Sequence, residues 1–237
     1  MENNSKNVTG ELSRMLGKTV VDFVDAILKS SQTVVTTSLE YASKKGDAQV
    51  VYEEELQDFS AKKLNITCES VSLVIRKGKN KKSYIRIYSN SDISGLDWEK
   101  HQVDSTFELT AENISEGNVN YKIRCDISND IKEINISLKN TTFVLKNLML
   151  DKAAINSRNG SVSCRNCNLG NSSVIQKNGT VVFEATSFDF CSVKIINGDL
   201  LMEDCIKSDY EITSNCMLGK INQLNCHIEN GHIRWEE

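Results

Sequence analysis

The sequence predicts a mainly β protein: a right-handed parallel β-solenoid with repeats of about 19 residues, preceded by mixed strands and a long N-terminal α-helix. The first observation is a repeat, since Asn-Gly pairs recur every 19 residues at 159–160, 178–179 and 197–198. The second is that apolar and polar residues alternate through the middle of the chain, which is typical of strands. The third is the absence of proline, of which a chain of 237 residues would carry about a dozen, so nearly every backbone N–H can join a ladder.

Residues 1–46 are expected to form an N-terminal amphipathic helix, with its helical turns over 9–45. Thr9 can cap the first turn, and Gly46 follows the last turn, where glycine commonly ends a helix. Apolar residues recur between them with helical spacing: Leu12, Met15, Leu16, Val20, Phe23, Val24, Ile27, Leu28, Val34, Val35 and Leu39. Because this stripe needs a partner, we expect an interaction face that includes Leu16, Val20, Phe23 and Ile27.

Residues 47–140 are expected to form a lead-in β region. Apolar residues alternate there in four strand-like sets, within 64–68, 71–75, 85–87 and 121–125. The basic run Arg76–Lys82 lies between two of these sets and is interpreted as a lysine-rich hairpin turn. Residues 89–104 do not follow the alternation and are expected to form a loop.

Residues 141–237 are expected to form the solenoid, and 47–237 to be one continuous domain. The repeats align without gaps in four columns: Phe143, Val162, Val181 and Leu200; Leu145, Cys164, Phe183 and Met202; Leu148, Cys167, Thr186 and Cys205; Ile155, Val174, Val193 and Ile212. A partial copy at 219–226 mirrors 160–167. Repetition at a short fixed period predicts a stack in which equivalent positions pair, with strands about 4.8 Å apart. Its right-handedness follows the usual preference of parallel crossovers.

Two further columns describe the surface of the predicted stack. One column is polar and consists of Asn147, Asn166, Asp204 and Asn225, with Ala185 as an interruption between Asn166 and Asp204. It suggests that side-chain amides stack at a second corner of the repeat. Another column is expected to face outward although three of its members are apolar: Val144, Ser163, Val182 and Leu201. We therefore expect Val144, Val182 and Leu201 to form an interaction face, either covered by residues 11–39 or used in self-association.

The repeats share the form glycine, small or acidic residue, aliphatic, any residue, aliphatic. They read Gly160-Ser-Val-Ser-Cys, Gly179-Thr-Val-Val-Phe and Gly198-Asp-Leu-Leu-Met. With these units and the lead-in strand 134–138, the chain resembles the bacterial putative-adhesin family of β-solenoid proteins over about residues 60–237. It departs at Lys139 and Asn140, where that family usually has proline. The resemblance implies a non-enzymatic scaffold or adhesin-like interaction role, in some members tied to the cell envelope and its stress responses, and it brings no catalytic residues.

One dense basic cluster is a candidate binding site: Arg76, Lys77, Lys79, Lys81, Lys82 and Arg86. Each lysine near an anionic membrane contributes about 1 kcal/mol, so a phosphate-rich surface is one partner to consider. The alternative is a solubilising turn, since lysines commonly protect exposed strand edges. With a net charge of −4, the chain has no general electrostatic reason to bind nucleic acid. We expect its main partner to be a second copy of itself or another protein.

The alternative function is a carbohydrate-active hydrolase or lyase that uses outer-face carboxylates. Glu184 and Glu203 occupy equivalent repeat positions and would lie side by side. Retaining glycosidases place two such carboxylates about 5 Å apart. However, Arg165 precedes Glu184 in the same column, and aromatic residues for sugar stacking make up only 6% of the chain. The sequence therefore favours a protein without enzymatic activity, and an Arg165–Glu184 ion pair would remove the support for the hydrolase.

No metal or cofactor is expected. Cys164 and Cys167 form an isolated CxxC pair within apolar columns, and His227 and His232 flank the last corner, so core packing and a polar end are the simpler interpretations. The first residues lack the apolar core of a signal peptide, and the most apolar stretch is too short for a membrane span. We therefore expect a cytoplasmic protein with eight reduced cysteines, with cell-envelope association as an open alternative.

Overall fold

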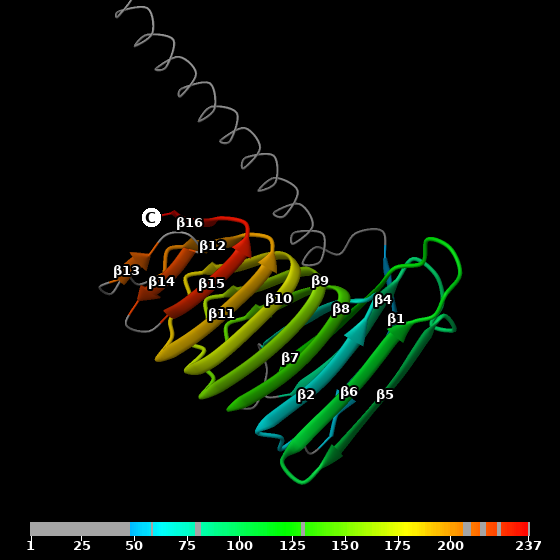
Figure 1. Cartoon of the computed structure of the whole chain (residues 1–237). Coiled ribbons are helices and arrows are strands. Elements are labelled where there is room, and N and C mark those ends of the chain that lie inside the picture. Colours follow the sequence, from blue (N-terminus) through cyan, green and yellow to red (C-terminus); the bar gives the residue numbers. More distant parts are fainter. Residues whose placement is uncertain are drawn as a thin grey trace, which may run out of the picture. The chain divides into compact units, whose positions relative to one another are not determined.

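All regular secondary structure in the described residues is β-strand, which confirms the mainly β class (Figure 1). The computed structural model describes residues 48–57, 59–78, 82–128, 131–205, 210–213, 217–221 and 224–236, all within the unit Leu39–Glu237. The helix expected over 9–45, with its stripe residues Leu16, Val20, Phe23 and Ile27, lies outside the described residues. The described part of the chain contains no helix that is long and apolar enough to cross a membrane.

Sixteen strands of the described chain form one mixed sheet. In chain order they are β1 Gln49–Leu56, β2 Lys63–Glu69, β3 Ser72–Lys77, β4 Ser83–Ser89, β5 Leu96–Val103, β6 Thr106–Asn113, β7 Tyr121–Ile127, β8 Glu133–Lys146, β9 Lys152–Arg165, β10 Asn171–Glu184, β11 Phe190–Asn197, β12 Leu200–Glu203, β13 Tyr210–Thr213, β14 Met217–Ile221, β15 Leu224–Asn230 and β16 Ile233–Glu236.

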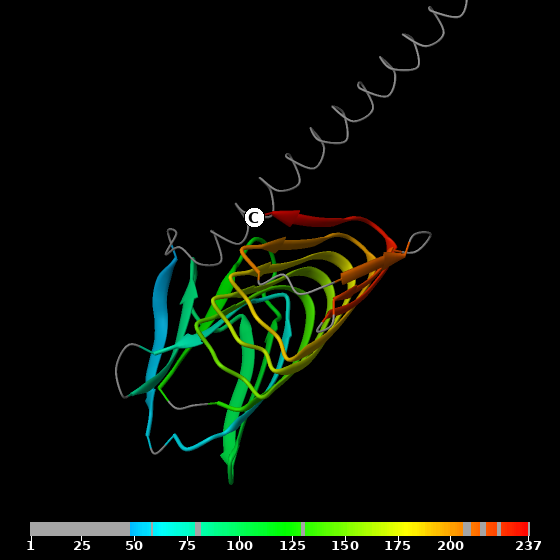
Figure 2. The same cartoon turned by 90° about the vertical axis from the view of Figure 1, so that its left-hand side faces the viewer.

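Strands β8, β9, β10, β11, β12, β15 and β16 pair in parallel, and we call them the parallel stack. Between β8 and β10 the register joins equivalent repeat positions: Leu145 pairs with Cys164, and Val162 with Val181. The predicted pairing of positions 19 residues apart is therefore confirmed for these strands. Figure 2 shows their successive turns nested one behind another. Alternate side chains such as Phe143 and Phe183 are buried in the hydrophobic core, because period-two alternation puts them on one face.

The Asn-Gly corners join the turns of the stack through side-chain amides. Each asparagine donates from Nδ2 to Oδ1 of the preceding one, over 2.9, 2.6, 2.8 and 3.0 Å. The series begins at Asn140, which Thr141 follows, and continues with Asn159, Asn178, Asn197 and Asn230, each followed by glycine. The glycine is required beside it: a Cβ on Gly179, whose φ is +132°, would lie 1.8 Å from the backbone oxygen of Gly160. Each corner therefore packs backbone against backbone.

The second polar column has a backbone explanation. Asn147, Asn166, Ala185 and Asp204 all adopt left-handed φ angles, of 56°, 50°, 46° and 50°. Asparagine and aspartate tolerate this conformation better than other residues with a side chain. The residue type in this column is therefore explained by the left-handed backbone conformation, and Ala185 adopts that conformation at a cost in free energy.

The repeat ends earlier than the sequence alignment predicts. Val193 pairs with Cys226 of β15, so Ile212 does not continue its column. Ile212 instead lies in β13, which pairs antiparallel with β14, and β14 pairs antiparallel with β15. The last two corner asparagines are consequently 33 residues apart rather than 19. The predictions that Ile212 continues the column of Val193 and that 219–226 is equivalent to 160–167 were therefore wrong. The antiparallel strands β13 and β14 are inserted before β15, which delays the next turn of the stack.

Two predictions for the lead-in region are also corrected. The basic run 76–82 is not a hairpin turn, because β3 and β4 both pair with β7, which lies between them. The loop expected over 89–104 is wrong for Leu96–Val103, which form β5 and pair antiparallel with β6, whereas residues 90–95 have no regular secondary structure, as predicted. Leu96 is buried and Trp98 packs against the core, but the rest of this edge strand is largely polar. The strand therefore lacks a clear alternation of apolar and polar residues in the sequence.

The apolar column expected to face solvent is buried. Val144 and Val182 are 1% and 3% exposed, and Ser163 between them is fully buried. In register they align with Val74 of β3 and Leu201 of β12, the latter half-buried. Val74, Val144 and Val182 alternate with core side chains on their strands and do not belong to the main core cluster. These positions therefore lie on the face away from the main core, as the repeat predicts, but Val144 and Val182 are buried and not open to solvent.

Candidate functional site: an arginine cluster around Asp126

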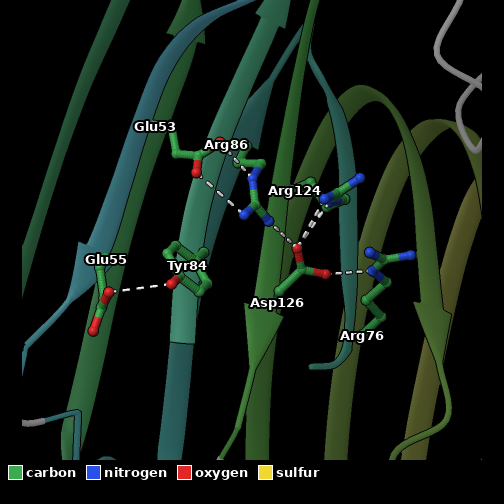
Figure 3. Close-up of polar contacts among 7 residues, drawn as sticks. All are labelled: Glu53, Glu55, Arg76, Tyr84, Arg86, Arg124 and Asp126. Carbon is green, nitrogen blue, oxygen red and sulfur yellow. Dashed lines mark hydrogen bonds and ion pairs between the residues drawn. The ribbon is translucent and has the colours of Figure 1, made fainter. Parts of the chain in front are cut away.

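Three arginines from three neighbouring strands converge on one carboxylate (Figure 3). The strand order β4–β7–β3 places Asp126 of β7 opposite Tyr84 of β4 on one side and Arg76 of β3 on the other. Arg86 of β4 lies opposite Arg124 of β7. Their strand neighbours at alternate positions, such as Ile75, Ile85 and Cys125, are buried in the core, so the charged side chains lie on the opposite face.

The Asp126 side chain is only 7% exposed and accepts bonds from all three guanidinium groups. Arg86 Nη1 donates to Oδ2 over 2.5 Å, and Arg124 donates to the same oxygen from Nε and Nη2, each over 3.0 Å. Arg76 Nε donates to Oδ1. Figure 3 shows Arg86 and Arg76 approaching the carboxylate from opposite sides. One buried carboxylate therefore fixes three cations.

Two glutamates of β1 complete the contacts on one side of the cluster. Glu53 accepts from Arg86 Nε over 2.7 Å and from Nη2 over 3.3 Å, and this bonding lowers the pKa of Glu53. Glu55 accepts from Lys82 over 2.7 Å and from Tyr84 over 3.1 Å, and the Lys82 bond lowers its pKa. The Arg86 guanidinium also lies 4.6 Å from the centre of the Tyr84 ring. Arg86 and Lys82 are thus each matched to a glutamate.

A pocket of about 220 Å³ opens at this cluster. Its lining residues are Arg76, Gly78, Lys82, Tyr84, Arg86, Arg124 and Asp126. Four of these side chains are cations and one is an anion, so the pocket has a cationic lining, and its three arginines and Asp126 lie on paired strands.

Two lysines extend the positive charge beyond the pocket. Burial and the nearby charges of Arg124, Lys146 and Arg76 lower the pKa of Lys122 to about 8. Burial and Arg165 lower the pKa of Lys146, and Arg76 adds to the effect. Both shifts have the sign expected where like charges crowd a partly buried site. Positive side chains of β3, β7 and β8 therefore lie close together around Arg76 and Arg124.

The structure divides the basic residues that the sequence predicted as a binding cluster. Arg76 and Arg86 meet at Asp126, and Lys82 lines the pocket. Lys77 ends β3 and is not among the lining residues, while Lys79 and Lys81 lie outside the described residues. The site also includes Lys122, Arg124, Asp126 and Lys146, which are not part of the basic cluster predicted from the sequence. Lys122, Arg124 and Asp126 alternate with Tyr121, Ile123 and Cys125. This pattern predicts that β7 has one charged face, but it does not predict which strands lie beside β7.

The structure also shows the positions of Glu184 and Glu203, the two carboxylates of the hydrolase alternative. Glu184 of β10 and Glu203 of β12 pair in register, as the repeat predicts. Arg165 Nε lies 3.0 Å from Glu184 Oε2, so Glu184 belongs to an ion pair. The contact that was expected to remove the support for a carboxylate-based hydrolase is therefore present.

The CxxC cysteines lie in the core, as predicted. Cys164 is fully buried, and burial raises its pKa well above the ordinary value. The thiol of Cys167 points at the backbone oxygen of Arg165, 3.2 Å away. Thr186 donates to the equivalent oxygen of Glu184 over 2.9 Å, so the column uses small donors to satisfy strand carbonyls. Across the described residues, no three His, Cys, Asp or Glu side chains group in a way that could hold a metal ion.

No protein-family model matches the chain, and no curated protein matches it. Several solved structures are similar to it at low identity. A putative cell adhesion protein from Clostridium sporogenes shares 14% identity over 80% of this chain and 99% of that chain, with a TM-score of 0.49. A putative adhesin from Parabacteroides merdae shares 10% identity over 81% of this chain and 97% of that one, with a TM-score of 0.32. A putative lipid binding protein from Parabacteroides distasonis shares 11% identity over 80% and 97%, with a TM-score of 0.30.

Proposed function

We propose that this protein is a non-enzymatic scaffold, a right-handed β-solenoid with an adhesin-like interaction role, and that it binds anionic groups of its partner through the arginine cluster. The observation that carries the proposal is the convergence of Arg76, Arg86 and Arg124, from three strands, on the single carboxylate of Asp126. Side chains on paired strands are held more rigidly than side chains on loops, which suits a binding site.

The repeat supports the scaffold part of the proposal. Parallel pairing at a constant offset of 19 residues lets each turn bury the apolar side of its neighbour. The right-handed sense rests on the general preference of parallel crossovers. In such an architecture, function resides in the long regular faces, and the arginine cluster lies where the lead-in strands continue one of these faces.

The partner and the location remain part of the proposal. A second copy of the chain or another protein is the expected partner, and an anionic membrane surface is an alternative source of the same charge. We place the protein in the cytoplasm, with association to the cell envelope through such a partner.

Chromatography on an immobilised polyanion such as heparin tests the binding role. Replacing both Arg76 and Arg124 by glutamine should lower the salt concentration at which the full chain elutes, because charge contacts depend on salt. The matched control replaces Lys152 and Lys177, which are exposed on β9 and β10, with the same loss of charge. An equal shift in both variants would show that only net charge matters and would contradict the proposal.

Self-association is tested separately. We expect the apolar stripe that the sequence predicts in residues 11–39, with Leu16, Val20, Phe23 and Ile27, to determine the oligomeric state. Light scattering on the full chain and on a chain without residues 1–46 should reveal a change in oligomeric mass. Two proteins of unchanged oligomeric state, solubility and stability would contradict this expectation.

A further inference from the structure

We infer that the arginine cluster holds one phosphate group of its partner, bound between the guanidinium groups of Arg76 and Arg124. The inference rests on the proposed anion-binding function and adds the chemical class of the ligand. Three observations support it: the arginine N–H donors that have no acceptor within the cluster, the charge around Arg76 and Arg124, and the volume of the pocket.

The internal bonds of the cluster use only part of its donors. Arg76 bonds Asp126 through Nε, and Arg124 bonds it through Nε and Nη2. Among the described contacts, both η nitrogens of Arg76 and Nη1 of Arg124 therefore have no acceptor. Arginine presents its N–H groups as a planar fork that matches the oxygens of phosphate. Two such forks, held on adjacent strands by the same carboxylate, can bind two oxygens of one phosphate.

The charge around these two arginines favours a dianion over a single carboxylate. Asp126 bonds Arg76, Arg86 and Arg124, and Glu53 bonds Arg86 and also interacts with the charge of Arg124, so these three arginines face two carboxylates. Lys122 and Lys146 lie close enough for their pKa values to respond to Arg76. A phosphate monoester carries a charge of about −1.5 to −2 at neutral pH, which offsets more of this excess than a carboxylate does.

The pocket has room for such a group. Its volume is about 220 Å³, and a water molecule takes about 30 Å³ of liquid, so a phosphate and several waters fit together. The Tyr84 hydroxyl already donates to Glu55, which leaves the arginines as the principal anion donors of the lining.

Asp126 acts here as a positioning residue. Its carboxylate is buried and binds all three arginines, so it holds the guanidinium groups in place before a ligand arrives. Pre-organisation of this kind lowers the entropic cost of binding.

Calorimetric titration of the full chain at pH 7 and constant ionic strength tests the inference with inorganic phosphate, phosphoserine and acetate as probes. We expect phosphate and phosphoserine to bind at least tenfold more tightly than acetate, and replacement of Arg76 and Arg124 by glutamine to remove this binding. Replacement of Lys152 and Lys177 by glutamine should leave it unchanged. A thermal melt of each variant establishes whether it is folded. If the arginine variant does not fold, Lys146→Gln replaces it in the test, because Lys146 makes no contact with Asp126, and this variant should bind phosphate severalfold more weakly.

Vesicles distinguish the source of the phosphate. Co-sedimentation with phosphatidic acid vesicles, but not with phosphatidylcholine vesicles, supports a lipid headgroup, whereas binding of free phosphate alone supports a soluble or protein-borne phosphate. Equal affinity for acetate and phosphate, or phosphate binding that persists in the arginine variant, would overturn the phosphate inference. The proposed function would survive that result if the arginine variant still lost its polyanion retention, and would fail if it did not.

Discussion

Asn178 Nδ2 donates a hydrogen bond to Asn159 Oδ1 over 2.6 Å, joining the same corner of two consecutive turns. Asn178 also accepts a bond from Asn197 over 2.8 Å, so it lies in the middle of an amide ladder. Replacing Asn178 by alanine removes both bonds, and we expect the free energy of unfolding to fall by about 1–3 kcal/mol. Denaturant unfolding measures the change. Asn171→Ala, an exposed position at the start of β10, is the control, and an equal effect at both sites would contradict a stabilising ladder.

Gly179 is expected to be the least replaceable residue of its corner. An alanine Cβ there would overlap the Gly160 oxygen at 1.8 Å, and the φ of +132° disfavours any side chain. Gly179→Ala should therefore cost more than the about 1–3 kcal/mol of backbone strain alone. Gly117→Ala is the matched control, because its φ is +88° but no atom lies within 4 Å of the added carbon. If thermal melts showed equal losses, steric contact between turns would not be the reason for glycine.

Ala185 should be improved by glycine. Its φ of 46° costs a residue with a Cβ about 1 kcal/mol or more, and glycine adopts this conformation freely. We expect Ala185→Gly to raise the free energy of unfolding by several tenths of a kcal/mol to about 1 kcal/mol. Ala154→Gly, at an ordinary strand position of β9, should lower it by about 0.5–1 kcal/mol. Chemical denaturation of the two variants should thus give opposite signs, and a loss at both would refute the strain argument.

Lys122 should make stability depend on pH. Burial and like charges lower its pKa from 10.5 to about 8 in the folded protein, so between these values the unfolded chain binds more protons. The free energy of unfolding then rises with pH from about 8 to about 10.5. Lys122→Met removes this contribution, so the stability of the wild type relative to the variant should increase across that window. Lys177→Met, at an exposed position of β10, controls for the loss of a charge, and parallel pH profiles for wild type and Lys122→Met would contradict the prediction.

The repeating part of the fold was predictable because its information is local and repeated. Gly160, Gly179 and Gly198 mark identical corners, and an identical pattern in each turn can be satisfied only when equivalent positions pair. The buried columns through Phe143 and Phe183 follow from the same periodicity.

The arginine cluster was only half predictable. Arg76 and Arg86 are close in sequence and were recognised as basic, but their apparent hairpin does not form. Asp126 lies 50 residues from Arg76 and 40 from Arg86, and no local pattern indicates that β7 inserts between β3 and β4.

The sequence by itself therefore determined the mainly β class, the corner chemistry and the register of β8, β9 and β10, since each depends on neighbouring residues or on a fixed repeat. Only the tertiary structure decided which lead-in strands pair, where the antiparallel insertion delays the last turn, and which cations gather around Asp126. These features depend on pairing between distant segments, and the free energy of that pairing comes from packing and charge contacts that exist only once the strands lie side by side.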